Sequence, residues 1–206
     1  IKNNFICDYD IYVPDMLVSK DDALEDVYKV LDVNDIKNDL DYKAHFLIRT
    51  MNENNHKKCI AYLNNVEEAE SFIRSVNKIK EYHGLEINTS LITADVNHKM
   101  RVKILDDFTN DTQIHIICSI RILDECIDIP ACDSIFLANQ QTNKIRTIQR
   151  ICRANRKDKN NKNKKSGIYM WSDEYNDIVN VIANLKEFDN TFTKEKVKLC
   201  NMNGDK

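Results

Sequence analysis

The pattern of hydrophobic and polar positions is most regular between residues 57 and 172. Short runs of consecutive apolar residues alternate there with longer stretches in which apolar residues recur every three or four positions. The apolar runs predict strands buried on both faces, and the stretches between them predict amphipathic helices. Strands that alternate with helices indicate a parallel sheet with helices on both of its faces. We therefore predict an α/β fold, a doubly wound parallel sheet.

The individual elements follow from the same pattern. The expected strands lie at 58–63, 87–92, 114–119, 134–138 and 167–172. The expected helices lie at about 66–82, 97–108 and 144–157. The stretch 157–165 has no apolar residue, so we expect a mobile, solvated loop there.

The segment before this core has a different pattern. Residues 4–13 alternate between apolar and mostly polar side chains, which predicts a half-buried strand, plausibly at an edge of the sheet. Pro14 ends the strand, and Ser19 is a suitable cap for an acidic helix over about 20–31. A second helix is expected over about 35–51, with an apolar side for packing.

The C-terminal stretch 173–199 predicts two further helices, the first with an apolar stripe for packing. We accordingly divide the chain into three parts. Residues 1–56 are an N-terminal strand and helices that lead into the domain, 57–172 are the core, and 173–206 are C-terminal helices packed on it. At 206 residues the chain is long enough for one domain that buries a sizeable core.

The expected helix at 144–157 has an unusual distribution of charge. On a helical wheel its buried face would consist of Ile145, Ile148, Ile151 and Cys152. The opposite arc carries Arg146, Gln149, Arg150, Arg153, Arg156 and Lys157. Nothing acidic lies within a turn of these guanidiniums until Asp158, so we expect the stripe to face an anion or an acidic partner. A merely solvated basic face is the alternative.

Composition narrows the possible functions. The net charge of −3 hides an asymmetry, since residues 8–41 contain eleven acidic residues and three lysines, whereas 143–166 contain ten Lys/Arg and one acid. Seven cysteines form no CxxC pair, which argues for a reducing compartment and against a zinc site. No apolar stretch approaches the roughly 18 residues of a membrane span, so we expect a soluble, intracellular protein. Three glycines cannot form a GxxxxGK[ST] phosphate loop.

Candidate chemistry concentrates after the strand at 114–119. In open α/β sheets, ligands bind outside the carboxyl ends of the strands. The loop that follows Ser119 places Arg121, Asp124 and Asp128 in a short connection just before the basic helix. An acidic loop beside a basic helix indicates a site for a phosphorylated ligand.

Two motifs in this region resemble those of a known family. The segment CSIRILDECIDIPACDSIFLANQQTNKIRTIQRICRANR (118–156) is similar to motifs V and VI of superfamily 2 helicases, LxEGxDxPxxDxV followed by QxxGRxxR. The positions that match are Leu123, Glu125, Asp128, Pro130, Asp133, Gln149, Arg153 and Arg156.

Upstream segments resemble the same family. KKCIAYLNNVEEAESF (57–72) is similar to motif IV, and MRVKILDDFTND (100–111) resembles the helix between motifs IV and V. CDYDIYVP (7–14) resembles large-DNA-virus members of this superfamily. The resemblance implies the second RecA-like domain of a two-domain, ATP-dependent motor. Its first domain, with the phosphate loop and the DEAD-type box, is not in this chain.

The resemblance also implies a role for each matched residue. Arg153 and Arg156 match the arginine fingers, which would stabilise charge on the phosphoryl group during ATP hydrolysis. Gln149 would bind the nucleotide or the interface between domains, as would Arg150. Asp128 matches the acid that contacts the ribose or couples the site to nucleic acid; a cap of its own tight loop is the alternative. ATP with Mg²⁺ would be bound mainly by the absent first domain, so the isolated domain is expected to be inactive.

The expected partners are DNA or RNA and the first RecA-like domain of the same protein. Ser119 and Arg121, which leave a strand end, would contact backbone phosphates, and Asn64 is a further candidate. The alternatives are a non-hydrolysing RecA-like module that binds nucleic acid or protein, and the motor part of a restriction or repair complex.

Two departures from the family pattern concern backbone geometry. Cys126 and Cys152 replace the usual glycines of motifs V and VI. Because a positive φ is costly for cysteine, either the local backbone is ordinary or the two small side chains pack together.

Overall fold

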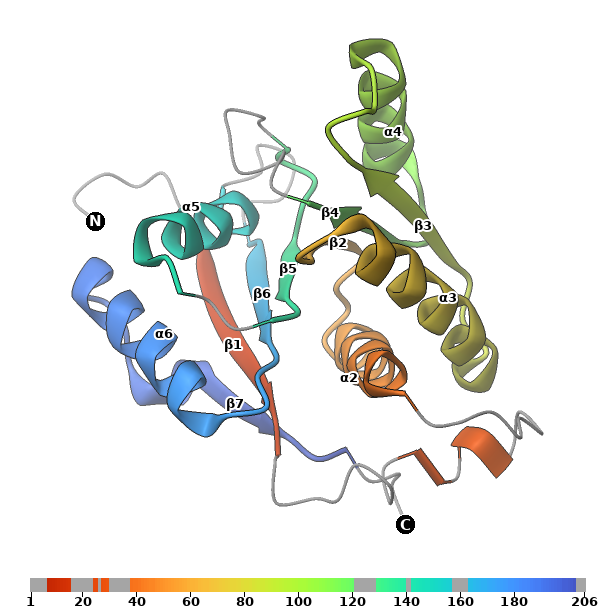
Figure 1. Cartoon of the computed structure of the whole chain (residues 1–206). Helices are drawn as coiled ribbons and strands as arrows, with labels where there is room; N and C mark the ends of the chain where they lie inside the picture. The colour runs from red at the N-terminus through yellow and green to blue at the C-terminus, as the bar shows by residue number, and fades with distance from the viewer. Residues whose placement is uncertain are drawn as a thin grey trace.

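The structure is a computed structural model. It describes residues 7–15, 24–25, 27–29, 38–120, 129–139, 142–156 and 163–202. Within these ranges the chain forms an open parallel sheet with helices on both faces (Figure 1). None of the helices in the same ranges is long and apolar enough to cross a membrane.

The sheet has seven strands in the described residues, in the order β3-β4-β2-β5-β6-β1-β7, and every pairing is parallel. The strands are β1 (Asp8–Pro14), β2 (Lys58–Tyr62), β3 (Ile87–Ile92), β4 (Ile114–Ser119), β5 (Ser134–Leu137), β6 (Lys165–Met170) and β7 (Val197–Cys200). The predicted doubly wound α/β fold is confirmed. The five core strands lie where their apolar runs predicted them, with ends that differ by two or three residues at most.

Helices cover the two faces of the sheet in two groups. They are α2 (Asp39–Glu53), α3 (Val66–His83), α4 (His98–Asn110), α5 (Lys144–Ala154) and α6 (Tyr175–Phe188). Successive side chains of a strand point to opposite faces, so Cys59 and Ala61 of β2 pack in the α2 and α3 core. Ile60 and Tyr62 pack in the second core, with α4, α5 and α6. Figure 1 shows α5 and α6 next to each other on one side of the sheet.

Local sequence signals determine where the helices begin and end. The side chains of Asn65, Asn97 and Asn143 each accept a hydrogen bond from a backbone N–H of the first turn of α3, α4 and α5. These caps satisfy donors that a helix cannot pair internally. Gly84 ends α3 in the left-handed conformation, with φ 61°. The helices α3, α4 and α5 therefore start within one residue of the predicted positions, whereas α2 starts at Asp39, four residues after its predicted start.

Both ends of the chain differ from the prediction. β1 is not at an edge, since it lies between β6 and β7, and six of its seven residues are buried. The second C-terminal helix is also wrong, because the tail forms a short 3₁₀ turn, η2 (Lys194–Lys196), and then the edge strand β7. A four-residue strand is too short for its pattern of apolar and polar residues to distinguish it from a helix. Of the expected helix at 20–31, residues 24–25 and 27–29 are helical, and its ends lie outside the described residues.

The expected solvated loop at 157–165 ends earlier than predicted. Residues 157–162 lie outside the described part, but Lys164 is buried and Lys165 begins β6. The Lys165 Nζ atom lies 2.6 Å from an Asp10 carboxylate oxygen on β1. Lys165 therefore belongs to a paired strand, although the hydrophobic pattern predicted a loop at this position.

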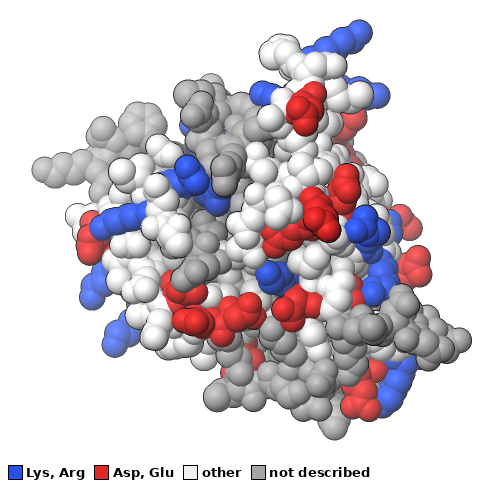
Figure 2. All heavy atoms as spheres, viewed as in Figure 1, with Lys and Arg blue, Asp and Glu red and all other residues white. Residues whose placement is uncertain are grey.

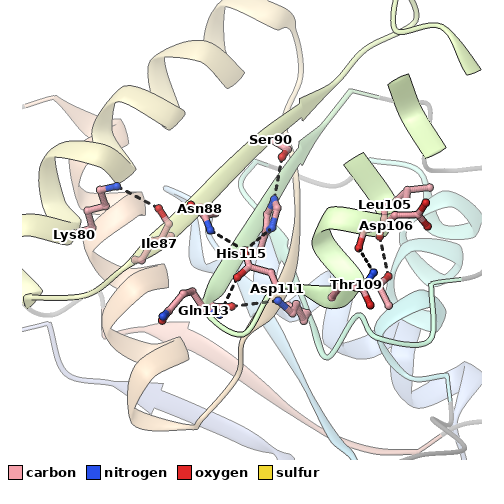
Figure 3. Close-up of polar contacts among 12 residues, drawn as sticks. Lys80, Ile87, Asn88, Ser90, Leu105, Asp106, Thr109, Asp111, Gln113 and His115 are labelled. Carbon is pink, nitrogen blue, oxygen red and sulfur yellow. Dashed lines mark hydrogen bonds and ion pairs between the residues drawn. The ribbon is translucent and has the colours of Figure 1, made fainter. Parts of the chain in front are cut away.

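A hydrogen-bonded chain of side chains holds the edge strand β3 to β4 (Figure 3). The His115 ring lies 2.9 Å from Ser90 Oγ through Nε2 and 3.0 Å from Asp111 Oδ2 through Nδ1. Asp111 also accepts from Asn88 Nδ2, at 2.7 Å, and from the Gln113 N–H. This sequence of groups resembles a serine nucleophile, base and acid. Because Asp111 also binds β3 and the turn before β4, we assign the network to the pairing of the edge strand.

A stacked pair of histidines joins α2 and α3. His45 and His83 have ring centroids 5.0 Å apart, and His83 Nε2 lies 3.1 Å from His45 Nδ1. Burial, followed by the charges of neighbours that include Arg49, lowers the pKa of His45 to about 3 and that of His83 to about 4, while Glu53 acts in the opposite direction on His83. Both histidines are therefore neutral in the folded protein near neutral pH.

Acid should destabilise the protein through this pair. Because both folded pKa values lie below the ordinary value of about 6.5, the unfolded chain takes up these protons first. The contribution is complete above pH 6.5 and is lost as the pH falls toward 4 for His83 and toward 3 for His45. We expect urea unfolding to show a loss of roughly 2–3 kcal/mol from each of these two groups between pH 7 and pH 4.5. A His45→Gln/His83→Gln variant should decline less steeply, and His98→Gln, on an exposed helix start, should behave as wild type. An unchanged slope in the double variant would contradict this explanation.

Candidate functional site

The sheet reverses its winding direction between β2 and β5. These two strands are neighbours, but α3, which follows β2, covers one face, and α5, which follows β5, covers the other. In open α/β sheets, ligands bind outside the carboxyl ends of the strands at such a switch point, and we call this place, between the ends of β2 and β5, the crevice. Asn64 and Asn139 each lie two residues after the end of one of these strands.

A hydrogen-bonded network orders this crevice around the Glu68 carboxylate. Glu68 accepts from the Asn64 backbone N–H at 2.8 Å and from Asn139 Nδ2 at 2.9 Å, and its own N–H donates to Asn65 Oδ1. Lys43 Nζ of α2 donates to Asn139 Oδ1 at 3.1 Å. The loop after β2 is therefore fixed to the loop after β5. Our sequence reasoning missed Lys43, Glu68 and Asn139, although the Asn-x-x-Glu spacing at 65–68 is a capping signal.

The buried face of α5 differs from the one that the helical wheel predicted. Ile148 and Ile151 are buried as expected, but Ile145 is 72% exposed and Cys152 is half-buried. The remaining buried side chains are Thr147, Arg150, Arg153 and Ala154. The basic stripe predicted from the wheel is therefore wrong as a continuous exposed face. A wheel places apolar residues inside, whereas here the side chains of two arginines, Arg150 and Arg153, are also buried.

Arg150 packs on an aromatic ring inside the domain. Its guanidinium carbon lies 4.5 Å from the centre of the Tyr62 ring, at the end of β2, and the side chain is 7% exposed. A guanidinium over an aromatic face is held by the ring's quadrupole and by its flat shape. Arg150 thus attaches α5 to the strand next to the crevice. Its predicted contact with a nucleotide or a domain interface stays a prediction.

The other predicted residues of α5 differ in their exposure. Gln149 is exposed, Arg156 is half-buried, and Arg153 is 7% exposed. All three lie on the last two turns of α5 or directly after it, on the helix that leaves the crevice from β5. Their predicted roles toward ATP are untested by this geometry.

Of the sequence-predicted residues in the segment 119–128, the structure describes Ser119. Ser119 ends β4 with a fully buried side chain. Arg121 and Asp128 fall outside the described residues, as does Cys126. Their predicted contacts with nucleic acid and nucleotide stay predictions.

Asp133, a matched position of motif V, has a structural role. Its carboxylate accepts the backbone N–H of Lys57 at 2.8 Å and of Lys58 at 3.0 Å, and the Ser134 hydroxyl at 2.9 Å. The Asp133 N–H in turn donates to the Lys58 carbonyl. This residue therefore joins the starts of β2 and β5, which places the two strands of the crevice side by side.

Cys152, which replaces the usual glycine of motif VI, has an ordinary helical backbone. It lies within the regular helix α5, and among the described residues Asn55 is the non-glycine with positive φ. An ordinary helical backbone therefore accommodates cysteine at this position. Burial raises the pKa of the thiol above its usual value, with Arg156 acting in the opposite direction. The described residues contain no group of three His, Cys, Asp or Glu side chains suited to a metal ion.

Charge is unevenly distributed on the face that Figure 2 shows. Acidic side chains gather near the start of α6 and along α3, whose first turns contain Asp177 and the pair Glu67 and Glu68. These carboxylates would repel phosphates. An anionic ligand of the crevice would therefore approach from the side of α5, which has no acidic residue in its sequence.

Comparisons with known proteins agree with this architecture. A type ISP restriction–modification enzyme, LlaBIII bound to DNA, has a TM-score of 0.71 at 16% identity, covering 98% of this chain and 16% of that one. The Mycobacterium smegmatis helicase Lhr bound to ssDNA and AMP-PNP has a TM-score of 0.58 at 16% identity, covering 88% of this chain and 22% of that one. S. cerevisiae Dbp5 bound to RNA and ADP BeF3 has a TM-score of 0.53 at 14% identity, with 95% and 42% covered.

These structural likenesses establish the fold, and the chain spans well under half of each of these proteins. No curated protein sequence matches the chain. The family model for the helicase conserved C-terminal domain matches residues 42–158, which is more than half of the 206 residues. The matched range contains the crevice, the Glu68 network and the whole of α5. The chain therefore belongs to the family of helicase conserved C-terminal domains.

Proposed function

We propose that this chain is the second motor domain of an ATP-dependent superfamily 2 helicase or translocase. The observation that carries the proposal is the position of Gln149, Arg153 and Arg156. They lie at the end of α5, inside the range matched by the helicase family and at the position of motif VI. The crevice between β2 and β5 is the ligand-binding place of this fold class.

Arginines in this position can act on a nucleotide bound elsewhere. ATP with Mg²⁺, held mainly by a first RecA-like domain, would supply the phosphoryl group. Arg153 and Arg156 would place guanidiniums beside it as negative charge develops, and Gln149 would bind the nucleotide or the facing domain. Asp128, on the motif V loop, would contact the ribose. Each of these steps needs the two domains to close on each other.

Nucleic acid would bind at the strand ends beside the crevice. Asn64 is exposed, and its backbone is fixed by Glu68, so a phosphate there would meet a preformed loop. Arg121 would add a contact from the loop after β4, whereas the fully buried side chain of Ser119 does not support its predicted contact with a phosphate. The related structures named above are bound to DNA, ssDNA or RNA, which supports a nucleic-acid partner without selecting one.

Nucleic-acid-stimulated ATPase activity tests the proposal. The complete protein, in which this chain is joined to its nucleotide-binding domain, should hydrolyse ATP slowly alone and faster with nucleic acid. Single- and double-stranded DNA and RNA should be compared at equal salt, because phosphate contacts weaken with ionic strength. The isolated chain should bind nucleic acid weakly and show no ATPase. A complete protein that binds nucleic acid but never hydrolyses ATP would instead indicate a non-hydrolysing binding module.

A restriction enzyme is a second possible context for the same motor. The likeness to LlaBIII covers 98% of this chain, with a TM-score of 0.71, and favours this context. Translocation along duplex DNA without strand separation would then be expected. A triplex-displacement assay detects such movement, and an unwinding assay on the same DNA should give no signal.

A further inference from the structure

The ammonium group of Lys164 is buried between three backbone carbonyls. Its Nζ atom lies 2.5 Å from the Cys132 oxygen, 2.8 Å from the Arg156 oxygen and 3.1 Å from the Pro130 oxygen. The residue is 7% exposed. A lysine ammonium has three N–H donors, so these carbonyls match its full hydrogen-bonding capacity.

The three carbonyls belong to the two motifs of the proposed active site. Pro130 and Cys132 lie at the end of the motif V segment, and Arg156 is the last matched arginine of motif VI. Lys164 itself directly precedes β6. One side chain thus joins two segments that are 24 residues or more apart in the sequence. One of its three contacts is with the backbone of Arg156, a proposed arginine finger.

The C-terminal end of α5 is held by buried hydrogen bonds, whereas a surface ion pair lies at its N-terminal end. Ser166 Oγ of β6 donates to Asn155 Oδ1 at 2.6 Å, and the Cys7 N–H donates to the Asn155 oxygen at 2.7 Å. At the other end of the helix, Lys144 forms an ion pair with Glu187 at the surface. Lys164 adds a hydrogen bond to the next residue, Arg156, and connects this end of the helix to motif V.

Burying a charged group to join two loops carries an unfavourable desolvation free energy. An ammonium loses its hydration on burial, and neutral carbonyls compensate for this only when all of its donors are used. A purely structural link could use a neutral side chain. The arrangement here instead fixes the Arg156 carbonyl against two specific carbonyls of motif V, which sets the orientation of the segment that contains both arginines.

We propose that Lys164 is a positioning residue for Arg153 and Arg156, and that it couples motif V to motif VI. This inference rests on the proposed function. When the motif V segment moves, Lys164 carries the end of α5 with it, so that the arginines reach the nucleotide in one arrangement of the segment. Lys164 touches neither ATP nor nucleic acid.

Steady-state kinetics of the complete protein test this role. Lys164→Met keeps the length of the side chain but removes its donors. We expect the nucleic-acid-stimulated kcat to fall by about 10²-fold, the scale expected for misplacing a catalytic group by about 1 Å. The KM for ATP should stay within about twofold, because the nucleotide is held mainly by the first domain. Lys165→Met is the matched control: this neighbouring lysine is exposed, its ammonium pairs with the Asp10 carboxylate on β1, and the kcat of the variant should stay near wild type.

A second readout separates positioning from general stability. Hydrogen exchange of the folded, isolated chain should become faster in residues 149–156 and 129–133 of Lys164→Met, and stay unchanged in β2 and β4. If that variant does not fold, Lys164→Arg, which keeps the charge but changes the donor geometry, takes its place with the same expectations.

Three outcomes overturn the proposal in distinguishable ways. A folded Lys164→Met protein with wild-type kcat and wild-type stimulation refutes the positioning role while leaving the motor intact. Slower turnover accompanied by faster exchange throughout the chain reduces Lys164 to a structural role. A wild-type protein without nucleic-acid-stimulated ATPase refutes the proposed function itself, and the role of Lys164 falls with it.

Discussion

Replacing Arg153 with lysine lowers the nucleic-acid-stimulated ATPase rate of the complete protein by about 10³-fold, the lower end of the range for arginine fingers. Lysine keeps the positive charge but loses the planar fork that can bind two phosphate oxygens at once. The side chain of Arg153 is also buried, so the substitution changes its packing as well as its donor geometry. We expect Arg156→Lys to lower the nucleic-acid-stimulated ATPase rate as well.

The control for this experiment is on the same helix. Arg146→Lys changes an exposed arginine that is not a matched position of motif VI, and its rate should stay within about twofold of wild type. Binding of a nonhydrolysable ATP analogue should change little in either finger variant, because the nucleotide is held mainly by the first domain. Full stimulated ATPase in both Arg153→Lys and Arg156→Lys would refute the arginine-finger assignment.

Asp133→Ala is expected to destabilise the isolated chain by about 3 kcal/mol, since hydrogen bonds to a charged acceptor contribute roughly 1.5–3 kcal/mol each and one of the partners lies at the surface. The substitution removes the acceptor of the Lys57 and Lys58 N–H groups and of the Ser134 hydroxyl. The amino ends of β2 and β5 would then lose their direct link. Urea unfolding monitored by circular dichroism measures this effect.

Asp133→Asn provides a matched comparison. The amide oxygen can still accept one of the two backbone N–H groups, but its NH₂ group faces the other donor, so an intermediate loss is expected. Both variants should leave the ATP affinity of the complete protein unchanged. A normal stability of Asp133→Ala, combined with lost ATPase activity, would move this residue from the fold to the active site.

The regular alternation of apolar runs and amphipathic stretches is what made the core predictable. The strands β2, β4, β5 and β6 are buried on both faces, so each of their sequences contains a short apolar run whatever its neighbours are. The edge strand β3 is partly exposed and correspondingly more polar. The asparagine caps and Gly84 specify helix ends within a few residues of chain. Motifs V and VI could be recognised for a similar reason, because their residues lie at fixed spacings within single segments. The strand order could not be read from any of these local signals.

The orientation of α5 shows where local reasoning fails. Its wheel predicted that Ile145 is buried and that all of the arginines are exposed, yet Ile145 is exposed and Arg150 lies on the Tyr62 ring. A helix that packs against both a sheet and neighbouring segments buries more than one face. Which polar side chains it buries depends on partners such as Tyr62, which is 88 residues away in the sequence.

The sequence by itself determined the class of fold, the limits of most core elements and the membership in the helicase family, because each depends on short-range patterns. Only the tertiary structure decided that β7 is the edge strand next to β1. The same is true of the links that Asp133 makes between β2 and β5 and that the Lys164 ammonium makes between motif V and motif VI. These three features depend on groups from distant segments that meet only after folding. A lysine in a polar stretch looks solvated until three carbonyls surround it, and its burial is therefore a property of the folded chain.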